Sequence, residues 1–501
     1  MKLPLTDLII FLIYMAGILL FGFSFFFRNR NSDQYTRGGG NIPSWAVAMS
    51  IFATFVSSIS FLALPGKAYQ SDWNAFVFSL SIPVAAWMAV KFFVPLYRSI
   101  GSISAYSYLE SRFGPWARIY ASLCYILTQI MRMGAILYLL ALPLNALLGW
   151  NIILIVAVTG ICVILYSMLG GIKAVIWTDT VQGIILVGGA LTCAVILLFS
   201  MPEGPRQLFH VASAYHKFNL GSLGASLSES TFWVVLIYGL FINLQNYGID
   251  QNYVQRYMTT STEKKAKQSA LFGSLLYIPV SMIFFFIGTA LFAYYKARPD
   301  LLPGYLEPAA AADRVFPYFI VSGLPAGLTG LLIASVFAAG MSTVSTSVNG
   351  VSTIIYTDYF RKLSGSGSSE KTSMGVLYIS SVLVGLTGTG VAVTMALLKI
   401  ESALDTWWSL ASVFSGGMLG LFLLGYFAKR VRKINAAIGV TVGVLIICWL
   451  SLSPLFFNQV GLLKFRSPFH SNLTIVIGTI VIFLTGFAGS AVFFKKQTTG
   501  N

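Results

Sequence analysis

The sequence has little charge, little cysteine and little histidine. Only 10% of its 501 residues are charged, whereas a soluble globular domain carries about 25%. The four cysteines show no CxxC or CxH spacing, so they predict buried thiols rather than a disulfide framework or a metal cluster. The three histidines lie in polar stretches, which gives a zinc site little support. These shortages exclude a disordered chain, a disulfide scaffold and an ordinary soluble enzyme.

Hydrophobic residues make up 56% of the chain and fall into long runs. A helix needs about 20 mostly apolar residues to cross a bilayer. The sequence therefore predicts an all-α integral membrane protein, a single transmembrane domain over residues 1–501 with about 13 transmembrane helices. The expected spans are 5–27, 43–65, 73–96, 117–147, 151–168, 175–200, 232–255, 269–296, 324–356, 374–398, 407–427, 434–452 and 472–494.

Lysine and arginine exceed aspartate and glutamate by 32 to 16, which gives a net charge of +16. With the N-terminus outside, about 20 of these cations fall in cytoplasmic segments, Arg256 in the segment 256–268 among them, and 10 in outer segments. The positive-inside rule thus predicts the N-terminus outside and the C-terminus inside, in a multi-pass protein of the plasma (inner) membrane. Loop topology explains the excess charge, so we expect the lipid bilayer and not nucleic acid as the partner.

Two of the expected spans carry polar residues at membrane depth, over Phe52–Ser60 and over residues 241–250. Serine and asparagine side chains compete for backbone hydrogen bonds, and a broken membrane helix is tolerated where it lines a cavity or is buried in protein. With the first span set aside, the breaks fall in helices 1 and 6, the first members of two five-helix halves. Breaks in corresponding positions indicate a transporter binding site. The alternative is that these polar residues only join packed helices.

The eighth of these helices carries a cluster of hydroxyl groups that includes Ser342, Thr343, Ser345 and Thr346. Hydroxyl oxygens and freed carbonyls suit a small monovalent cation, although small residues also serve helix packing. Asp179, at the start of helix 5, is a carboxylate inside the membrane and needs a partner. That partner is a bound cation or nearby Lys173.

Arg132 lies in the middle of helix 3, too deep to reach the membrane surface easily. Its planar guanidinium matches a carboxylate, so it could hold an anionic substrate or pair with a protein acid or carbonyls. Asp250 ends the polar stretch of helix 6, where we expect it to cap a helix that starts at Gln251.

Several short motifs now point to one family. They are Arg37–Pro43 with the following 45–60, residues 170–183, 250–256, the hydroxyl cluster, and 416–420. In this order and spacing the chain resembles the sodium:solute symporter family. It is most similar to the bacterial sodium–sialic acid symporters of that family, through Ala68-Tyr69, Ser71-Asp72-Trp73 and Arg132.

The resemblance implies a leucine-transporter (LeuT) fold made of inverted five-helix repeats. The extra helix 5–27 would precede a first repeat over 43–200 and a second over 232–427, and two additional helices would occupy 434–494. We expect the protein to work as a monomer.

The family also implies sodium as the transported ion, with one or two ions in each cycle. The first sodium site would use the carbonyls of three residues and the hydroxyls of two, namely Ala53, Val56, Ala339, Ser342 and Thr343. A second site, present in some relatives, would use Asp179, Ser345 and Thr346 together with Ser342. All the required oxygens are present here.

For the substrate, the resemblance assigns the carboxylate-binding role to Arg132 and hydroxyl contacts to Ser57 and Ser60. Two positions on the expected pocket wall depart from the sialic acid relatives. Phe55 stands where they have threonine, and Ser79 stands where they have glutamine.

Two further positions match sugar-transporting relatives in part. Asn243 is similar to an amide that they use, and Asn246 replaces an aromatic residue that gates the sugar in some of them. The resemblance thus implies a sodium-coupled symporter that imports sialic acid or a similar carboxylated sugar by alternating access. A neutral sugar or a polyol is the alternative substrate, and a transporter-like membrane sensor is a less favoured function. We expect no enzymatic activity, because the sequence offers no acid–base or metal constellation.

Overall fold

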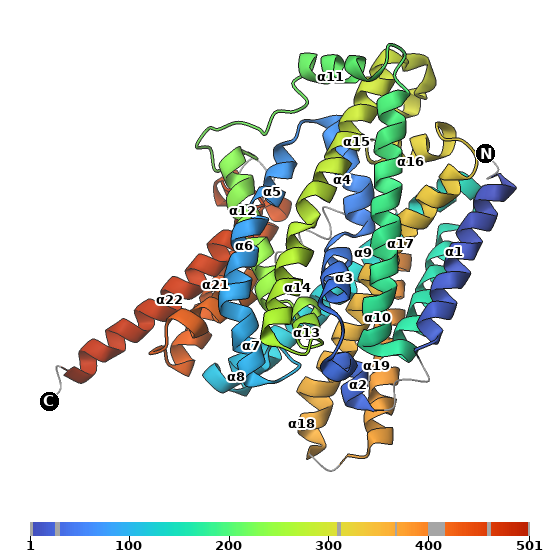
Figure 1. The fold of residues 1–501 in the computed structure, drawn as a ribbon. Helices are drawn as coiled ribbons and strands as arrows, with labels where there is room; N and C mark the ends of the chain where they lie inside the picture. The colour runs from blue at the N-terminus through green and yellow to red at the C-terminus, as the bar shows by residue number, and fades with distance from the viewer. Residues whose placement is uncertain are drawn as a thin grey trace.

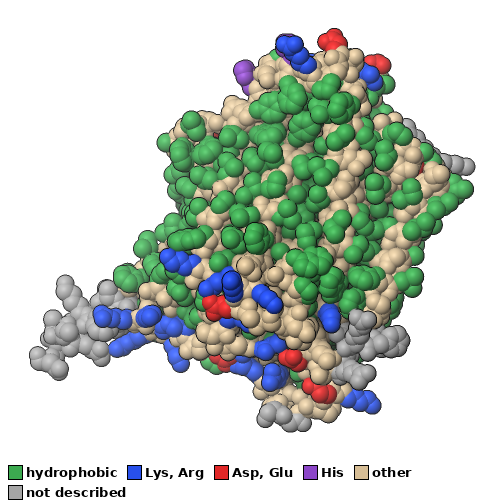
Figure 2. Space-filling model, viewed as in Figure 1, with side chains coloured by type: hydrophobic (Ala, Val, Ile, Leu, Met, Phe, Trp, Pro, Cys, Tyr) green, Lys and Arg blue, Asp and Glu red, His purple; other side chains and the backbone are tan. Residues whose placement is uncertain are grey.

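The computed structural model describes residues 4–25, 31–307, 312–365, 368–398, 416–457 and 462–498, and every regular element in these ranges is helical. The helices stand together in one bundle (Figure 1). Helix α1 begins at the upper right of the bundle, and α22 extends away from the bundle at the lower left (Figure 1). Figure 2 shows a broad apolar flank with lysine and arginine side chains gathered toward the lower end. An apolar flank of this kind suits a bilayer.

Nine helices in the described residues are long and apolar enough to cross a membrane, and one bent pair adds a further span. Two shorter apolar helices, Gly416–Phe427 and Leu473–Gly489, stand beside them. The main elements are α1 Leu5–Phe23, α3 Ser44–Phe55, α4 Ser58–Gln70, α5 Val77–Leu80, α6 Ile82–Met88, α7 Val94–Ile100, α9 Pro115–Leu148, α10 Ile152–Phe199, α12 Phe232–Ile249, α13 Gln251–Tyr257, α14 Glu263–Leu275, α15 Tyr277–Ala297, α17 Leu328–Ile354, α19 Glu370–Leu397, α21 Lys433–Phe456 and α22 Leu473–Thr498.

Short helices lie between these spans. They are α2 Ser32–Arg37, α8 Ser107–Phe113 and α18 Arg361–Leu363 at the lower end of Figure 1, and α11 Pro205–Ala214 and α16 Ala312–Ser322 toward its upper end. A π-helical turn, Ile355–Phe360, joins α17 to α18. The first part of the predicted span 407–427 lies outside the described residues, and its second part is the helix Gly416–Phe427.

The predicted break in the first core helix is confirmed. Helix α3 ends at Phe55 and α4 begins at Ser58, and the two helices are bent by 55°. Val56 between them has the extended angles φ −79° and ψ 110°. The last carbonyls of α3 therefore have no following turn to accept from and are open to other donors.

The predicted break over residues 241–250 was wrong in its extent. Helix α12 continues without interruption to Ile249, and only Asp250 leaves the helical conformation. The reason is that the Asn243 side chain donates to the Phe78 carbonyl at 3.3 Å and to Ser81 Oγ at 3.0 Å, so it does not compete with its own helix. The predicted cap is confirmed, since the Asp250 carboxylate accepts the Asn252 N–H at 2.8 Å and starts α13.

Helix α10 covers two of the predicted spans, 151–168 and 175–200. Its 48 residues form two arms that meet at Gly171, where the backbone has φ 58° and ψ −165°. Only glycine adopts this conformation without strain, and a Cβ here would lie 2.8 Å from the Tyr35 carbonyl oxygen. The tight turn brings Asp179, eight residues later, into the centre of the bundle.

Helix α17 is the central column of the bundle and is almost entirely buried. Small residues let its neighbours come close. A Cβ on Gly340 would lie 2.3 Å from a Leu140 methyl of α9. A Cβ on Gly350 would lie 2.3 Å from the hydroxyl of Tyr125, which is also on α9. Close packing of this kind places the α17 hydroxyls beside α3, α9 and α10.

Candidate functional site

The break between α3 and α4 faces the hydroxyl cluster of α17. Ser342 Oγ donates to the Ala53 carbonyl oxygen at 3.1 Å, and Thr343 Oγ1 donates to the Ala339 carbonyl at 3.2 Å. All four residues are buried, as is Val56 at the break. The predicted first sodium set is thus drawn from two adjoining elements, and Ser342 and Ala53 are in direct contact. Freed carbonyls beside hydroxyls are the ligands that transporters offer to sodium.

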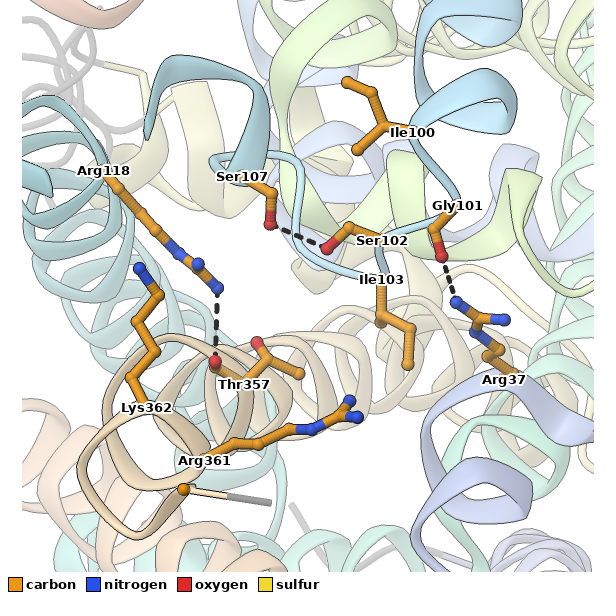
Figure 3. Close-up of a pocket in the computed structure, with 11 residues that line it drawn as sticks. Arg37, Ile100, Gly101, Ser102, Ile103, Ser107, Arg118, Thr357, Arg361 and Lys362 are labelled. Carbon is orange, nitrogen blue, oxygen red and sulfur yellow. Dashed lines mark hydrogen bonds between the residues drawn. The ribbon is translucent and has the colours of Figure 1, made fainter. Parts of the chain in front are cut away.

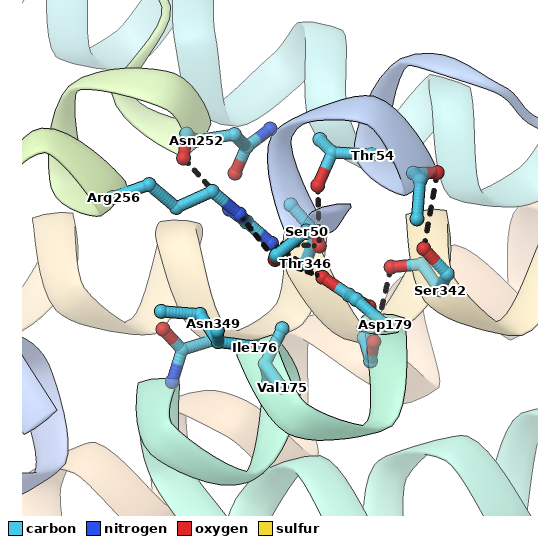
Figure 4. A network of polar contacts seen from close by, with 12 residues as sticks. Ser50, Thr54, Val175, Ile176, Asp179, Asn252, Arg256, Ser342, Thr346 and Asn349 are labelled. Atoms are coloured by element: carbon cyan, nitrogen blue, oxygen red, sulfur yellow. Dashed lines mark hydrogen bonds and ion pairs between the residues drawn. The ribbon is translucent and has the colours of Figure 1, made fainter. Parts of the chain in front are cut away.

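A buried ion pair lies next to this contact (Figure 4). Arg256 Nη2 on α13 is 2.8 Å from Asp179 Oδ2 on α10, and the two side chains are 1% and 0% exposed. The same nitrogen donates to Thr346 Oγ1 at 2.7 Å. Arg256 Nε donates to Ser50 Oγ at 2.7 Å, and that hydroxyl donates to Asp179 Oδ2 at 2.5 Å. One guanidinium therefore joins α13 to α3, α10 and α17.

The structure corrects two expectations about these charges. The protein partner of Asp179 is Arg256 and not Lys173. Arg256 is also no loop cation, because it is buried on α13. The sequence did contain a sign of this partner, namely the arginine at the end of the motif 250–256, on the helix that follows Asp250.

The predicted second sodium set includes Asp179 of this ion pair and Thr346, which accepts from Arg256. Thr346 Oγ1 lies 3.3 Å from Thr54 Oγ1, and Ser345 Oγ donates to the Ser342 carbonyl at 3.0 Å. Asp179 Oδ1 is buried and has no hydrogen-bond partner among the described residues. A buried carboxylate oxygen without a partner is costly, so it is open to a further cation or donor.

Arg132 of α9 also reaches the end of α3 at the helix break. Its Nη2 donates to the Thr54 carbonyl oxygen at 3.2 Å, next to the Ala53 carbonyl that accepts Ser342. The Arg132 side chain is only partly buried. The sequence left open whether this residue meets substrate or protein carbonyls, and in this structure one of its nitrogens holds a carbonyl. Its other donors can serve a ligand carboxylate.

An aromatic cluster forms one wall beside the break. The Phe55 ring stacks on Tyr247 at 5.3 Å between centroids and meets Tyr277 edge-on at 4.5 Å. Phe78 and Tyr253 lie farther out, at 6.4 Å each. These aromatic partners could not be read from the sequence, because they come from four other helices, α5, α12, α13 and α15.

The remaining predicted substrate residues occupy different environments. Ser57 lies buried at the start of α4, with Ser60 half-buried one turn later. Ser79 Oγ is 2.9 Å from Ser281 Oγ. The Asn243 amide nitrogen is held by α5 and its neighbouring residues, while its Oδ1 is buried without a hydrogen-bond partner in the described residues. Asn246 lies half-buried three residues further along α12.

Comparisons with known proteins match this architecture. The model of the sodium:solute symporter family matches residues 35–443. The sodium/sialic acid symporter SiaT of Proteus mirabilis is 36% identical over 435 residues, which cover 86% of each chain. The sodium/sialic acid symporter NanT of Aliivibrio fischeri is 33% identical over 487 residues, covering 96% of this chain and 92% of the relative.

Solved structures agree with the sequence comparisons. A substrate-bound, outward-open sodium-coupled sialic acid symporter, described as having a novel sodium site, superposes with a TM-score of 0.89 at 32% identity. The alignment covers 98% of each chain. A closed form of Mhp1, a nucleobase-cation-symport-1 family transporter, superposes with a TM-score of 0.53 at 14% identity and shares the fold alone.

Proposed function

Because the chain belongs to the sodium:solute symporter family, we propose that it imports sialic acid, or a similar carboxylated sugar, together with sodium. The sodium/sialic acid symporters among its relatives support this choice of solute. One observation carries it further. Arg132 presents a guanidinium at the break between α3 and α4, beside the candidate sodium oxygens.

A guanidinium at this place suits a carboxylate, because its forked donors match two carboxylate oxygens. The hydroxyls of Ser57 and Ser60 would meet the sugar, with Ser79, Asn243 and Asn246 on the farther side of the pocket. Phe55 would form the apolar wall.

Sodium would couple to the solute through the break itself. An ion held by Ala53, Val56, Ala339, Ser342 and Thr343 would fix α3 against α17, and so favour the shape in which Arg132 faces the solute. A second ion would use Asp179 with Ser342, Ser345 and Thr346. Two ions crossing about 100 mV down a tenfold gradient would supply about 7 kcal/mol, of which an anionic solute returns about 2.3 kcal/mol.

The arrangement in the membrane follows the same proposal. The chain would cross the plasma (inner) membrane about 13 times, with the N-terminus outside and the C-terminus inside. The inverted repeats would occupy 43–200 and 232–427, with 5–27 before them and 434–494 after them. The basic lower end of Figure 2 would then face the cytoplasm, and a monomer would suffice for transport.

The test compares sialic acid binding to the purified full-length protein in sodium and in potassium buffer. We expect thermal stabilisation in sodium only. Arg132→Ala should raise the apparent Kd for sialic acid by about 100-fold, since truncating one partner of a buried charge pair costs about 2–5 kcal/mol, and should leave sodium binding largely intact. Lys91→Gln is the matched control. Lys91 is also a cation within an apolar span, but it packs over the Trp87 ring at 4.7 Å and not at the helix break. Unchanged affinity in Arg132→Ala would make Arg132 structural.

A second candidate solute is a carboxylate with a smaller, apolar body. The stacked Phe55 and Tyr247 rings favour it, because an apolar body can bury its whole surface against such a wall, whereas a sugar ring offers only its C–H face. The same screen decides between them when it includes short and aromatic monocarboxylates beside sialic acid.

A further inference from the structure

A basic cavity is drawn in Figure 3. Residues of α2, α7, α8 and α18 line it, and these helices lie at the lower end of the bundle in Figure 1. The volume of the cavity is about 580 Å³. Among the described residues, four cations and no acidic side chain line it; the cations are Arg37, Arg118, Arg361 and Lys362. A cleft lined by one sign of charge concentrates ions of the opposite sign.

Three of the four cations already have acidic neighbours. Arg118 pairs with Glu110 at 2.7 Å and also with Asp358, and Lys362 pairs with the same glutamate. The Arg37 Nε lies 3.6 Å from an oxygen of Asp33. Arg361 is exposed, and in the described part of the chain it forms no ion pair. Figure 3 shows its side chain reaching across the cavity from α18. The unbalanced charge of the cavity is therefore that of Arg361.

A stripe of polar side chains on α9 connects the cavity to the helix break. Its members are spaced by three or four residues and so lie on one face of the helix: Arg118, Ser122, Tyr125, Gln129 and Arg132. Arg118 and Arg132 are 14 residues apart, which is about 21 Å along the helix. The stripe thus spans the distance from the candidate substrate arginine to the basic cavity.

The upper half of this stripe faces the second helix break. Gln129 Nε2 donates to Asp250 Oδ2 at 3.2 Å, and Gln129 Oε1 accepts Ser347 Oγ of α17 at 2.8 Å. The Tyr125 hydroxyl donates to Asn252 Oδ1 at 2.7 Å. These contacts close the seam between α9, α13 and α17 with hydrogen bonds rather than with apolar packing.

The lower half faces the turn after α17. Ser122 Oγ lies 2.8 Å from the Tyr359 hydroxyl, and Arg118 Nη2 donates to the Thr357 carbonyl at 3.2 Å. Thr357 also lines the cavity. Polar groups spaced by about one turn therefore run along α9 from Arg132 to the cavity. If the helices around this seam moved apart, the groups could exchange their present hydrogen bonds for bonds to a polar solute.

We propose that the basic cavity is a low-affinity anion subsite, which receives the carboxylate of the solute after it leaves Arg132 and passes along the polar face of α9. Arg361 is the residue that makes the subsite attractive to an anion. This inference rests on the proposed function in one respect, namely that the transported solute carries a carboxylate.

The test separates sodium-dependent binding from sodium-independent binding of the same probe. Sialic acid binding to the purified full-length protein is measured by equilibrium dialysis in sodium and in potassium buffer, at low ionic strength. In potassium buffer we expect a weak component whose Kd rises by at least about threefold in Arg361→Gln. Raising the salt from about 0.01 M to about 0.1 M should weaken it as well, since the Debye length falls from about 30 Å to about 10 Å.

Arg430→Gln is the matched control, because Arg430 is an exposed cation that does not line the cavity. The weak component should persist in this variant, and the sodium-dependent Kd should be unchanged in both variants. In proteoliposomes, Arg361→Gln should raise the KM for solute presented on the basic side about threefold, and Arg361→Lys should restore it.

Three outcomes would overturn the inference. They are the absence of any sodium-independent component, equal loss of it in Arg361→Gln and Arg430→Gln, and its full persistence in Arg361→Gln. Failure of the proposed function would look different, because the sodium-dependent component would then be missing in the wild-type protein.

Discussion

The carboxylate of Asp179 and the guanidinium of Arg256 form an ion pair that water does not reach. The two groups are 2.8 Å apart, with 0% and 1% of their side-chain surface exposed. Ser50, Thr346 and the Asn252 carbonyl form further hydrogen bonds with them. A sodium ion at the second candidate site would share Asp179 with this guanidinium, so the pair belongs both to the scaffold and to the ion-binding region.

Breaking this pair should destabilise the protein strongly. Arg256→Gln leaves a buried carboxylate without its cation, and such a change typically costs about 3–5 kcal/mol of the free energy of unfolding. The double variant Asp179→Asn with Arg256→Gln should lose less than Arg256→Gln alone, because no uncompensated charge remains. Thermal unfolding in detergent measures both.

The exposed pair between Glu263 and Lys267, at 2.7 Å, serves as the control for that experiment. Lys267→Gln should change the free energy of unfolding by at most about 1 kcal/mol. An equal loss in Arg256→Gln and Lys267→Gln would contradict the role given to the buried pair.

Removal of one hydroxyl should weaken sodium binding selectively. Ser342→Ala deletes the group that contacts the Ala53 carbonyl and, in the proposal, an ion ligand. We expect the sodium concentration for half-maximal binding to rise by about tenfold, which corresponds to about 1.4 kcal/mol. Ser352→Ala is the control, since Ser352 is equally buried on α17 but donates only to the Asn349 carbonyl of its own helix. Equal sodium dependence in the two variants would remove Ser342 from the ion site.

Shortening the aromatic wall should change the choice of solute. Phe55→Thr removes the ring that stacks on Tyr247 and meets Tyr277, and it widens the space beside the break. We expect sialic acid to bind several-fold more tightly and aromatic monocarboxylates to bind about tenfold more weakly, because loss of one aromatic contact costs about 0.5–1.5 kcal/mol. Competition binding with both solutes measures the ratio of their dissociation constants. A variant in which the ratio stays constant would show that Phe55 does not face the solute.

Acid should loosen the lower end of the bundle through Glu110. Burial alone would raise the pKa of Glu110, but hydrogen bonds from Lys362 and Arg118 hold it below its ordinary value. A lowered pKa in the folded state means that the unfolded chain takes up the proton first as the pH falls. The contribution of Glu110 to stability is therefore present above the unfolded pKa and is lost as the pH falls through the folded pKa.

Glu110→Gln tests this dependence. Unfolding is followed at pH 7 and near pH 4, close to the ordinary carboxyl pKa of about 4.3. The stability gap between the wild-type protein and the variant should be largest at pH 7 and should shrink in acid. A gap that is constant with pH would mean that the charge of Glu110 contributes nothing.

The membrane character and the main landmarks of the fold were predictable from the sequence. Long apolar runs are local, so they reveal spans without knowledge of packing. The break at Val56 and the cap at Asp250 were also readable, because serine, asparagine and aspartate act on the backbone within a few residues. The short motifs indicated the family for the same reason, because each of them is a local feature of the sequence.

Tertiary structure alone decided which groups meet. Asp179 forms its ion pair with Arg256, 77 residues away in the chain, and not with Lys173 nearby. Helix α12 stayed intact across Asn243 because Phe78 and Ser81, about 160 residues earlier in the chain, accept from its amide nitrogen. The aromatic wall around Phe55 and the basic cavity beside Arg361 also combine distant segments. A polar or aromatic side chain has several acceptable partners at membrane depth, and only the packing of the whole bundle determines which of them is within reach.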